Sequence, residues 1–393
     1  MYSNKLSKST LGHNKDGDDT DQINVLFVTD QNTGMPVYYR TYSGQIPDAS
    51  TIKFFLQKNA RIKLEENAVF IADKGYSSII NLHRFYQSKA SFLLNMRTSY
   101  SMCKNFVREN IIELNDPCNY VPSIGNSVVT TEINWSYPVN FKTNCKGRVP
   151  KLKAPMFAHV FYSREIYNQA QQNLTHNIGE TIQCIYKGKT LTSFQQNIKD
   201  RFLIEKEDGS FATNRANYDN YMEMKGIRVL VSDTVKDPLE AYKAYYDRNE
   251  VEYNFNIYKQ RLGCNRARVS DERALEGKAF VQFIATSIAV IFRKRLQQTI
   301  KAGFRFSYSS DGEVLTKLNS ITQTKFEFGS YYSETVGKIR ELLDAMNIPI
   351  PDGELASDYE YDSDLEAIAE ERAYYEINDE LDLDITDVER ELM

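Results

Sequence analysis

The stretch YYDRNEVEYNFNIYK, residues 245–259, constrains the fold more than any other part of the chain. Four polar side chains in it are separated by three, four and seven residues, namely Tyr245, Arg248, Glu252 and Lys259. A helix turns by about 100° per residue, so side chains at these offsets share one face. The spacing therefore predicts a single helix whose polar face carries a phenol, a guanidinium, a carboxylate and an ammonium group.

Apolar side chains recur at helical spacing beside this polar face. They are Leu239, Tyr242, Tyr246, Tyr253 and Ile257. We expect this stripe to dock the helix onto a core. The polar face would then bind a divalent metal through its carboxylate and phosphate oxygens through its cations. The alternative is a solvated charged face without chemistry, which is the usual interpretation of a helix with this much charge.

A second carboxylate follows a short apolar run in VFIADKGYSS, residues 69–78. The run ends at Asp73 and is broken at Gly75, and Ser77 and Ser78 are available to cap a following helix. Asp73 is thus predicted at the carboxyl end of a buried strand, where open α/β sheets gather ligands. The alternative is an Asp-x-Gly turn that carries no chemistry.

Together the two segments resemble the DDE transposases of bacterial insertion sequences. The spacing in residues 245–259 is similar, residue for residue, to the Y-(2)-R-(3)-E-(6)-K signature of that family. The resemblance implies that Asp73 is the second aspartate and Glu252 the last of three metal-binding carboxylates, and that the two side chains meet. It also implies that Arg248 and Lys259 hold the backbone of the transposon end, and that Tyr245 contacts phosphate or a displaced base.

A third segment, GMPVYYRTYSGQIPDAST at residues 34–51, is similar to the strand, Gly-Asn-x-x-Asp turn and helix of the same family. Gln45 replaces the usual asparagine, so no role is carried over to that side chain. Asp48 is more simply a cap or first-turn carboxylate of a helix through residues 51–57.

The resemblance implies an α/β fold, with a ribonuclease-H-like mixed sheet and helices interrupted by a largely β insertion. It implies cut-and-paste DNA transposition, in which carboxylates hold two Mg²⁺ (or Mn²⁺) ions about 3.5 to 4 Å apart while phosphodiester bonds are cleaved and rejoined. The implied partners are double-stranded DNA, as transposon ends and target, and a second copy of the chain as a homodimer on that DNA. The implied location is the bacterial cytoplasm, associated with the nucleoid and not with a membrane.

The first catalytic aspartate of the family lies in an Asp-x-Thr context on the first strand, upstream of the match that begins at Leu11. Residues 1–10 contain no carboxylate, so the first metal ligand and the first strand are expected to be missing through truncation. The Gly/Asp-rich run that follows is ordinarily an exposed loop; its carboxylates are Asp16, Asp18, Asp19 and Asp21. The chain is then either a transposase or a non-catalytic DNA-binding or dimerising remnant that inhibits full-length copies. An in-frame Asp-x-Thr just upstream in the DNA would favour the enzyme.

These placements predict the organisation of the chain. The predicted parts are a loop remnant at 1–21, the first part of the core at 22–98, an insertion subdomain at 99–215, the second part of the core with the signature helix at 216–300, a helical or irregular region at 301–350 and an acidic tail at 351–393. In the core we expect residues 23–28 and 36–42 to be strands of the mixed sheet, and residues 226–233 to return to it.

Within the predicted insertion, residues 140–153 hold five cations and no acid beside aromatic side chains. Basic and aromatic groups together suit contacts to phosphate and to an unstacked base, so Lys146 and Arg148 are predicted to bind DNA. A flexible loop between hairpin strands is the equal alternative.

The net charge of −5 hides a split between body and tail. Residues 351–393 hold 17 acidic side chains against two arginines, which leaves a net charge of +10 on residues 1–350. A basic body suits a nucleic-acid partner. The tail is ordinarily a solvated segment, with a mimic of DNA that competes for the basic surface as the sharper alternative.

Other features exclude several classes of site. The five cysteines show no CxxC pair and the four histidines are scattered, so neither zinc nor a disulfide framework is predicted. The longest apolar run, at residues 279–292, has fourteen residues and is too short to span a bilayer. It predicts a buried helix that packs against the catalytic core.

Overall fold

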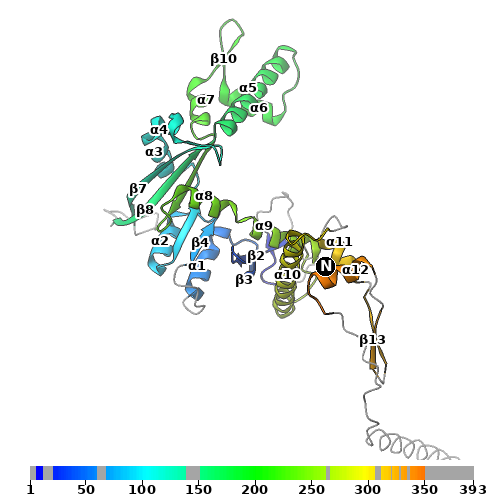
Figure 1. The fold of residues 1–393 in the computed structure, drawn as a ribbon. Coiled ribbons are helices and arrows are strands. Elements are labelled where there is room, and N and C mark those ends of the chain that lie inside the picture. Colours follow the sequence, from blue (N-terminus) through cyan, green and yellow to red (C-terminus); the bar gives the residue numbers. More distant parts are fainter. Residues whose placement is uncertain are drawn as a thin grey trace, which may run out of the picture. The chain divides into compact units, whose positions relative to one another are not determined.

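The computed structural model describes residues 6–11, 21–59, 68–138, 151–262, 266–305, 311–319, 321–326, 329–333 and 337–349 (Figure 1). They belong to two compact units, divided between Ser287 and Ile288, and each unit is described by itself. The predicted acidic tail at 351–393 lies outside the described residues.

A mixed six-stranded sheet forms the centre of the first unit, as the α/β prediction requires. Its strands in spatial order are β4 (Val69–Ala72), β5 (Ser91–Asn95), β11 (Ile227–Ser232), β8 (Lys151–Tyr162), β7 (Asn126–Pro138) and β6 (Tyr120–Val121). Only β4 and β5 are parallel; the other pairs are antiparallel. The predicted strand at 226–233 is confirmed as β11, which enters between β5 and β8.

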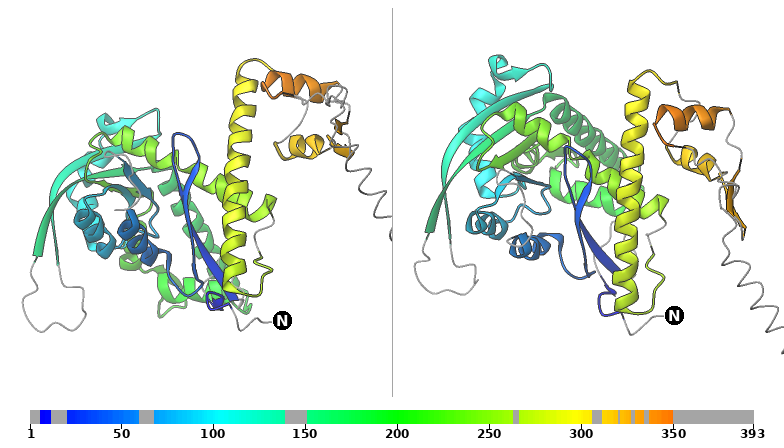
Figure 2. Two further views of the ribbon diagram at one scale, coloured as in Figure 1. Left: turned by 90° about the horizontal axis from the view of Figure 1, so that it is seen from below. Right: turned by 60° about the horizontal axis from the view of Figure 1, so that its bottom comes forward.

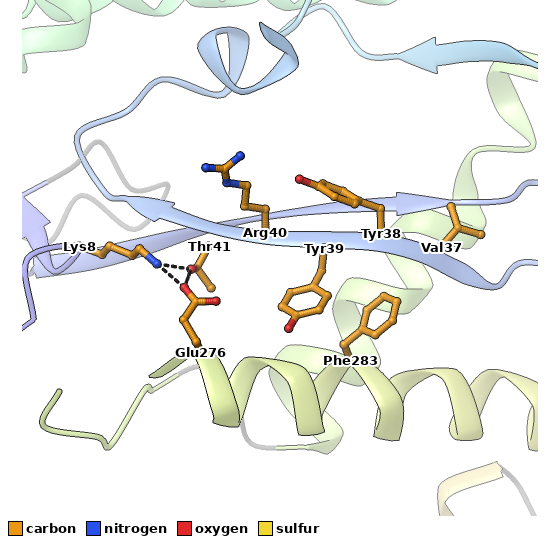
Figure 3. A pocket seen from close by; sticks show the side chains of 8 residues that line it. All are labelled: Lys8, Val37, Tyr38, Tyr39, Arg40, Thr41, Glu276 and Phe283. Carbon is orange, nitrogen blue, oxygen red and sulfur yellow. Dashed lines mark hydrogen bonds and ion pairs between the residues drawn. The ribbon is translucent and has the colours of Figure 1, made fainter. Parts of the chain in front are cut away.

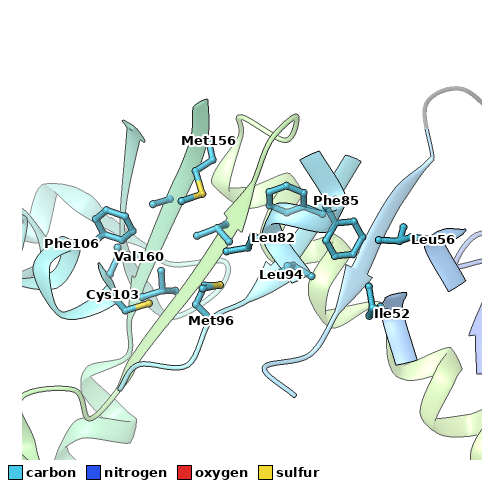
Figure 4. Packing of buried hydrophobic residues seen from close by; sticks show 14 of the residues in the cluster. Ile52, Leu56, Leu82, Phe85, Leu94, Met96, Cys103, Phe106, Met156 and Val160 are labelled. Carbon is cyan, nitrogen blue, oxygen red and sulfur yellow. The ribbon is translucent and has the colours of Figure 1, made fainter. Parts of the chain in front are cut away.

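Helices cover this sheet because its central strands are apolar on both faces. The three middle residues of β5, Phe92, Leu93 and Leu94, are fully buried. Helix α2 (Ile79–Ser88) packs Leu82 and Phe85 against Phe92 and Leu94, and Figure 4 shows this core with α3 (Ser101–Glu109) beyond it. Ser78 caps α2 by accepting a hydrogen bond from the Asn81 amide, as the sequence predicts.

The two strands within residues 21–43 belong to a separate three-stranded antiparallel sheet, although they were expected in the mixed sheet. Its strands are β1 (Thr10–Leu11), β2 (Asp21–Thr29) and β3 (Pro36–Ser43), in that spatial order. The predicted strands at 23–28 and 36–42 are therefore confirmed, but their sheet is not. Among the described residues, nothing pairs with the outer edge of β4, and β2 beyond Gln22 pairs only with β3.

Helix α1 (Asp48–Asn59) connects the two sheets through one aromatic side chain. The Phe55 ring lies 5.2 Å from the ring of Tyr38 in β3 and 5.2 Å from that of Phe70 in β4. Asp48 is in the first turn of α1, as predicted, where a carboxylate complements the helix dipole.

The segment between β5 and β11 lengthens the sheet and then turns helical. Strands β7 and β8 form a long hairpin whose register runs from Ser127 opposite Tyr162 to Pro138 opposite Lys151 (Figure 2). The remaining elements are α4 (Ile111–Asn115), η1 (Pro117–Asn119), α5 (Arg164–Tyr186), α6 (Ser193–Phe202), β9 (Leu203–Glu205), β10 (Phe211–Thr213) and α7 (Arg215–Met222). Helices α5 to α7 share a small core of their own, built around Leu174, Ile198 and Phe202.

After β11 the chain is helical. The elements are α8 (Pro238–Tyr246), α9 (Asn249–Asn256), the π-helical turn η2 (Ile257–Arg261) and α10 (Glu272–Lys301).

The predicted helix at 279–292 is confirmed as part of α10, but the prediction that it is buried is wrong. Helix α10 has 30 residues, and within the first unit Phe280, Val281 and Ile284 are 55%, 64% and 42% exposed. Only one side of this half of the helix meets the β2–β3 hairpin, where Phe283 stacks near Tyr39 with 4.8 Å between ring centroids. By length and composition α10 is able to cross a membrane, but one such helix is weak evidence for a membrane protein.

The second unit contains the remainder of α10 and three further elements, α11 (Asp311–Leu318), a hairpin of β12 (Gln323–Phe326) with β13 (Gly329–Tyr332), and α12 (Lys338–Ala345). Its core is formed by Leu296 of α10, Val314 of α11, and Leu342 and Met346 at α12. Helices α11 and α12 lie within residues 301–350, the region predicted to be helical or irregular.

Gly226 is predicted to be indispensable where β8 and β11 meet. Its φ is +73°, and a Cβ there would lie 2.4 Å from the carbonyl oxygen of Ser163. We expect Gly226→Ala to lower the free energy of unfolding by at least about 2 kcal/mol in urea titrations. Gly179→Ala, in open space on α5, is the matched control and should gain up to about 1 kcal/mol. Equal stabilities of the two variants would contradict this account of the junction.

Candidate active site

Asp73 lies where two parallel strands end side by side. It follows β4 directly, and the parallel register that pairs Ala72 with Leu94 brings Asn95 of β5 level with it. The Lys74 amide donates to Asp73 Oδ1 at 2.7 Å, and Asn95 Nδ2 lies 3.5 Å from the same oxygen. The carboxyl ends of β4 and β5 thus present a carboxylate and an amide together, at the edge where α/β sheets bind ligands.

Helix α8 places Tyr245 at this edge of the sheet. The Tyr245 hydroxyl donates to Asp73 Oδ1 at 2.8 Å and accepts from Asn95 Nδ2 at 2.8 Å. Its ring is only 2% exposed and packs with Leu93 and Leu230. Three segments of the chain therefore converge on one phenol.

The sequence interpretation of this helix was wrong in two respects. Tyr245 lies on the packed face with Ala241, whereas Leu239 and Tyr246 of the predicted apolar stripe are exposed. A tyrosine can be buried at such a position because its hydroxyl finds both a donor and an acceptor.

The predicted single helix is also interrupted. Helix α8 ends at Tyr246, Asp247 and Arg248 form a turn with ψ near zero, and α9 begins at Asn249. The cause lies in β2–β3, because the Gln31 side chain donates to the carbonyl of Ala244 at 2.8 Å. That carbonyl would otherwise accept from the amide of Arg248, so an inserted side chain breaks the ladder and bends the helix.

Arg248 brings the two predicted carboxylates together. Its Nη1 lies 3.8 Å from Asp73 Oδ2, and its Nη2 lies 3.7 Å from Glu252 Oε1. One guanidinium thus contacts both side chains, which lie far apart in the sequence. Glu252 remains 65% exposed, so it faces solvent on the open side of the site.

The other predicted DNA-binding residues are not part of this cluster. Lys259 is exposed on η2, with Nζ 5.7 Å from the ring centroid of Phe255, and in the described part of the chain it contacts neither carboxylate. π-helical turns often occur at functional sites. Lys146 and Arg148 lie outside the described residues.

The surroundings of Asp73 keep it charged. Burial raises the pKa of the carboxyl, but the Lys74 amide, the Tyr245 hydroxyl and the charge of Arg248 lower it by more, so the net pKa lies below its usual value. Burial and the hydrogen bond to Asp73 raise the pKa of Tyr245, so the phenol keeps its proton. The site therefore combines an ionised carboxylate with a neutral hydroxyl donor at neutral pH.

The donor set suits a hard divalent cation but is incomplete. Asp73 Oδ2 and Glu252 Oε1 both turn to a positive group, and carboxylate oxygens are the ligands that Mg²⁺ and Mn²⁺ prefer. Within the described ranges, no three His, Cys, Asp or Glu side chains cluster as a metal site. A metal held by this pair would take the place that the Arg248 guanidinium has here.

A cavity lies elsewhere, between β3 and α10 (Figure 3). It has a volume of about 500 Å³, and its lining includes neither Asp73 nor Glu252. Glu276 of α10 accepts from Thr41 of β3 at 2.6 Å and pairs with Lys8, so this contact anchors the amino-terminal segment on the helix. We assign the cavity no part in the chemistry of the carboxylate pair.

A comparison with protein families identifies the chain. The family described as transposase DDE domain matches residues 4–288, which include Asp73, Arg248 and Glu252. The chain belongs to the DDE transposase family. Its members are transposases that act on DNA and generally depend on divalent metal ions, and they are typically cytoplasmic. No curated protein matches the chain.

Sequence analysis missed two polar residues of this site. Asn95 ends the strand beside β4, so a search for polar groups at the ends of neighbouring strands would have found it. Gln31 lies in a turn with no motif, and its effect on α8 depends on a contact across more than two hundred residues. Nothing in the local sequence marks it.

The Asn95–Tyr245 contact is predicted to stabilise the fold. Tyr245→Phe removes the 2.8 Å acceptor of the half-buried Asn95 amide, which then has only the longer 3.5 Å contact to Asp73 Oδ1, and it should lower the free energy of unfolding by about 1 to 3 kcal/mol. Combined with Asn95→Leu in a double-mutant cycle, it should show a coupling energy of about 0.5 kcal/mol or more. Tyr186→Phe, at an exposed tyrosine of α5, is the control. Strict additivity of the two costs would show that the pair does not interact.

Proposed function

We propose that the chain is the catalytic core of an insertion-sequence transposase, with Asp73 and Glu252 as metal-binding carboxylates for phosphodiester cleavage and strand transfer. The observation that carries this proposal is the guanidinium of Arg248, which contacts both carboxylates at the carboxyl end of β4. Membership of the DDE family supports the reaction class. The proposed location is the bacterial cytoplasm, on nucleoid DNA.

The metal would be Mg²⁺ or Mn²⁺. When bound, it activates the attacking oxygen and stabilises the leaving oxygen of an in-line phosphodiester displacement. The residues of the chain do the positioning. Tyr245 and the Lys74 amide both bind Asp73 Oδ1, which leaves Oδ2 directed at the site.

The cations near the pair suit the DNA backbone. Arg248 is placed to release its two carboxylates to a metal and to hold a phosphate oxygen instead, since a guanidinium binds phosphate in the same fork geometry. Lys259 on η2, and Lys146 and Arg148 in the tract outside the described residues, are proposed as further backbone contacts. Phosphate neutralisation supplies much of the affinity of such proteins for DNA.

Two unpaired strand edges indicate where a strand that carries the third carboxylate of the family would fit. The outer edge of β4 and one edge of β2 have no partner in the described part of the chain, and β4 is the strand that ends at Asp73. Parallel strands are ordinarily paired on both sides and buried. A strand carrying the first aspartate would fit this place in the family resemblance. We therefore propose that the described residues form an incomplete metal site.

An alternative function follows from the same observation. A chain with two of three ligands would bind DNA, or pair with full-length copies, without cutting. It would then act as an inhibitor of the active transposase. Both proposed functions include a homodimer of the chain on DNA.

Metal affinity tests the carboxylate pair directly. With two carboxylates we expect Mn²⁺ binding with a dissociation constant on the order of 10⁻⁴ to 10⁻³ M by calorimetry, because hard cations need several charged oxygen ligands. Asp73→Asn and Glu252→Gln should each weaken it by more than about tenfold, and Glu240→Gln, on α8, should leave it unchanged. Tight Mn²⁺ binding that survives Asp73→Asn would place the metal site elsewhere.

Cleavage separates the two alternatives. Because one ligand is missing from the described site, we expect the 393-residue chain to bind a supercoiled plasmid without nicking it in Mg²⁺ or Mn²⁺. If it nicks the plasmid and Glu252→Gln abolishes the nicking, the chain is an enzyme with a third ligand. One of Asp16, Asp18, Asp19 and Asp21 would then be the first residue to substitute.

A further inference from the structure

Arg228 lies at the same edge of the six-stranded sheet as Asp73. Leu230 of β11 pairs with Asn95 at the end of β5, and the two strands are antiparallel. Arg228 is therefore two residues beyond the end of β5, on the side where β4 ends at Asp73. Neighbouring strands are about 4.8 Å apart, so β11 lies two strand spacings, about 10 Å, from β4.

The guanidinium of Arg228 has donors to spare. Its Cζ lies 4.7 Å from the ring centroid of Tyr246 and 5.4 Å from that of Tyr245. Its Nη1 is buried and has no hydrogen-bond partner, and no described carboxylate pairs with it. Cation–π contacts use the face of the guanidinium and leave its N–H groups without acceptors. A buried donor in this state is costly, so a ligand with acceptor oxygens is favoured here.

A small pocket lies beside Arg228. Its volume is about 170 Å³, and its lining combines the polar groups of Asn126, Ser163, Tyr242 and Tyr246 with the apolar side chains of Phe161, Ile166 and Ile227, and includes no Asp or Glu. Gly226 makes the pocket possible, since its missing side chain lets β11 approach the start of α5 at Ser163. A guanidinium with hydroxyl and amide groups, and without a carboxylate, is the chemistry that binds a phosphate.

We propose that this pocket, with Arg228 as its cation, binds a backbone phosphate of the DNA strand whose scissile bond lies at Asp73 and Glu252. The inference rests on the proposed function and extends it to a residue outside the signature. Phosphates of one strand rise by about 3.4 Å per nucleotide. A strand of a few nucleotides therefore reaches from the carboxylate pair to Arg228.

The same arginine also supports the carboxylate site through Tyr245. The ring of Tyr245 has the guanidinium of Arg248 at 4.8 Å and that of Arg228 at 5.4 Å, while its hydroxyl binds Asp73. A phosphate held at Arg228 is thus coupled to the position of Asp73 by a single rigid ring. A substitution of Arg228 removes both its charge and its packing against this ring, so a test must distinguish the two effects.

The test is the salt dependence of DNA binding. Wild type, Arg228→Met and Arg228→Lys are compared for affinity to a 30-base-pair duplex of random sequence over a series of NaCl concentrations. Methionine keeps an unbranched apolar side chain against the two rings and removes the charge, while lysine keeps the charge. Arg215→Met is the matched control, because Arg215 also lies over a tyrosine, Tyr218, but on α7. Urea titrations confirm that each variant is folded.

We expect Arg228→Met to weaken binding roughly tenfold and to reduce the slope of log affinity against log salt by about 0.9, the value of one phosphate contact. Arg228→Lys should keep the slope, and Arg215→Met should keep both slope and affinity. If the duplex binds wild type and Arg228→Met with the same slope, the pocket is not a phosphate site, although the proposed function stands. If wild type does not bind the duplex at all, the proposed function fails and this inference fails with it.

Discussion

The hydroxyl of Tyr245 is the contact on which the arrangement of the site depends. It joins β4 through Asp73, β5 through Asn95 and the last turn of α8. Because Asn95 Nδ2 can only donate, the phenol must accept from it and direct its own proton to Asp73. That donation, with the Lys74 amide, holds Oδ1 of the carboxylate and leaves Oδ2 to the Arg248 guanidinium. A buried tyrosine can therefore support the site from inside the core.

The break after α8 sets the direction of α9, the helix that carries Glu252. Gln31 takes the Ala244 carbonyl, and Asn254 of α9 donates to the Gly34 carbonyl at 3.0 Å, so the β2–β3 hairpin holds both sides of the turn. Arg248 lies in this turn and reaches across to Asp73 and Glu252. The hairpin thus influences the carboxylate pair although it shares no strand pairing with β4. Its separation from the mixed sheet leaves backbone groups at the β2 and β4 edges without partners in the described residues.

Local patterns in the sequence predicted the elements that depend on local physics. The strand before Asp73, the cap at Ser78 and the strand at β11 follow from periodicity and turn chemistry and are confirmed, but β4 is half-buried and not buried as predicted. The sequence did not predict which sheet β2 and β3 join, because strand pairing depends on distant parts of the chain and not on local periodicity. Periodicity also misplaced Tyr245, since an amphipathic phenol suits a buried or an exposed face equally well. The broken helix depended on Gln31, which no window around residue 248 contains.

The central claim is that Asp73 and Glu252 share a divalent metal in place of the Arg248 guanidinium. The most direct measurement is the anomalous difference density of manganese in crystals of the chain grown with a saturating concentration of Mn²⁺. The account predicts a peak about 2 Å from a carboxylate oxygen of each residue, with Arg248 displaced from between them. A peak bound to other residues, with Arg248 still bridging the two carboxylates, would contradict it.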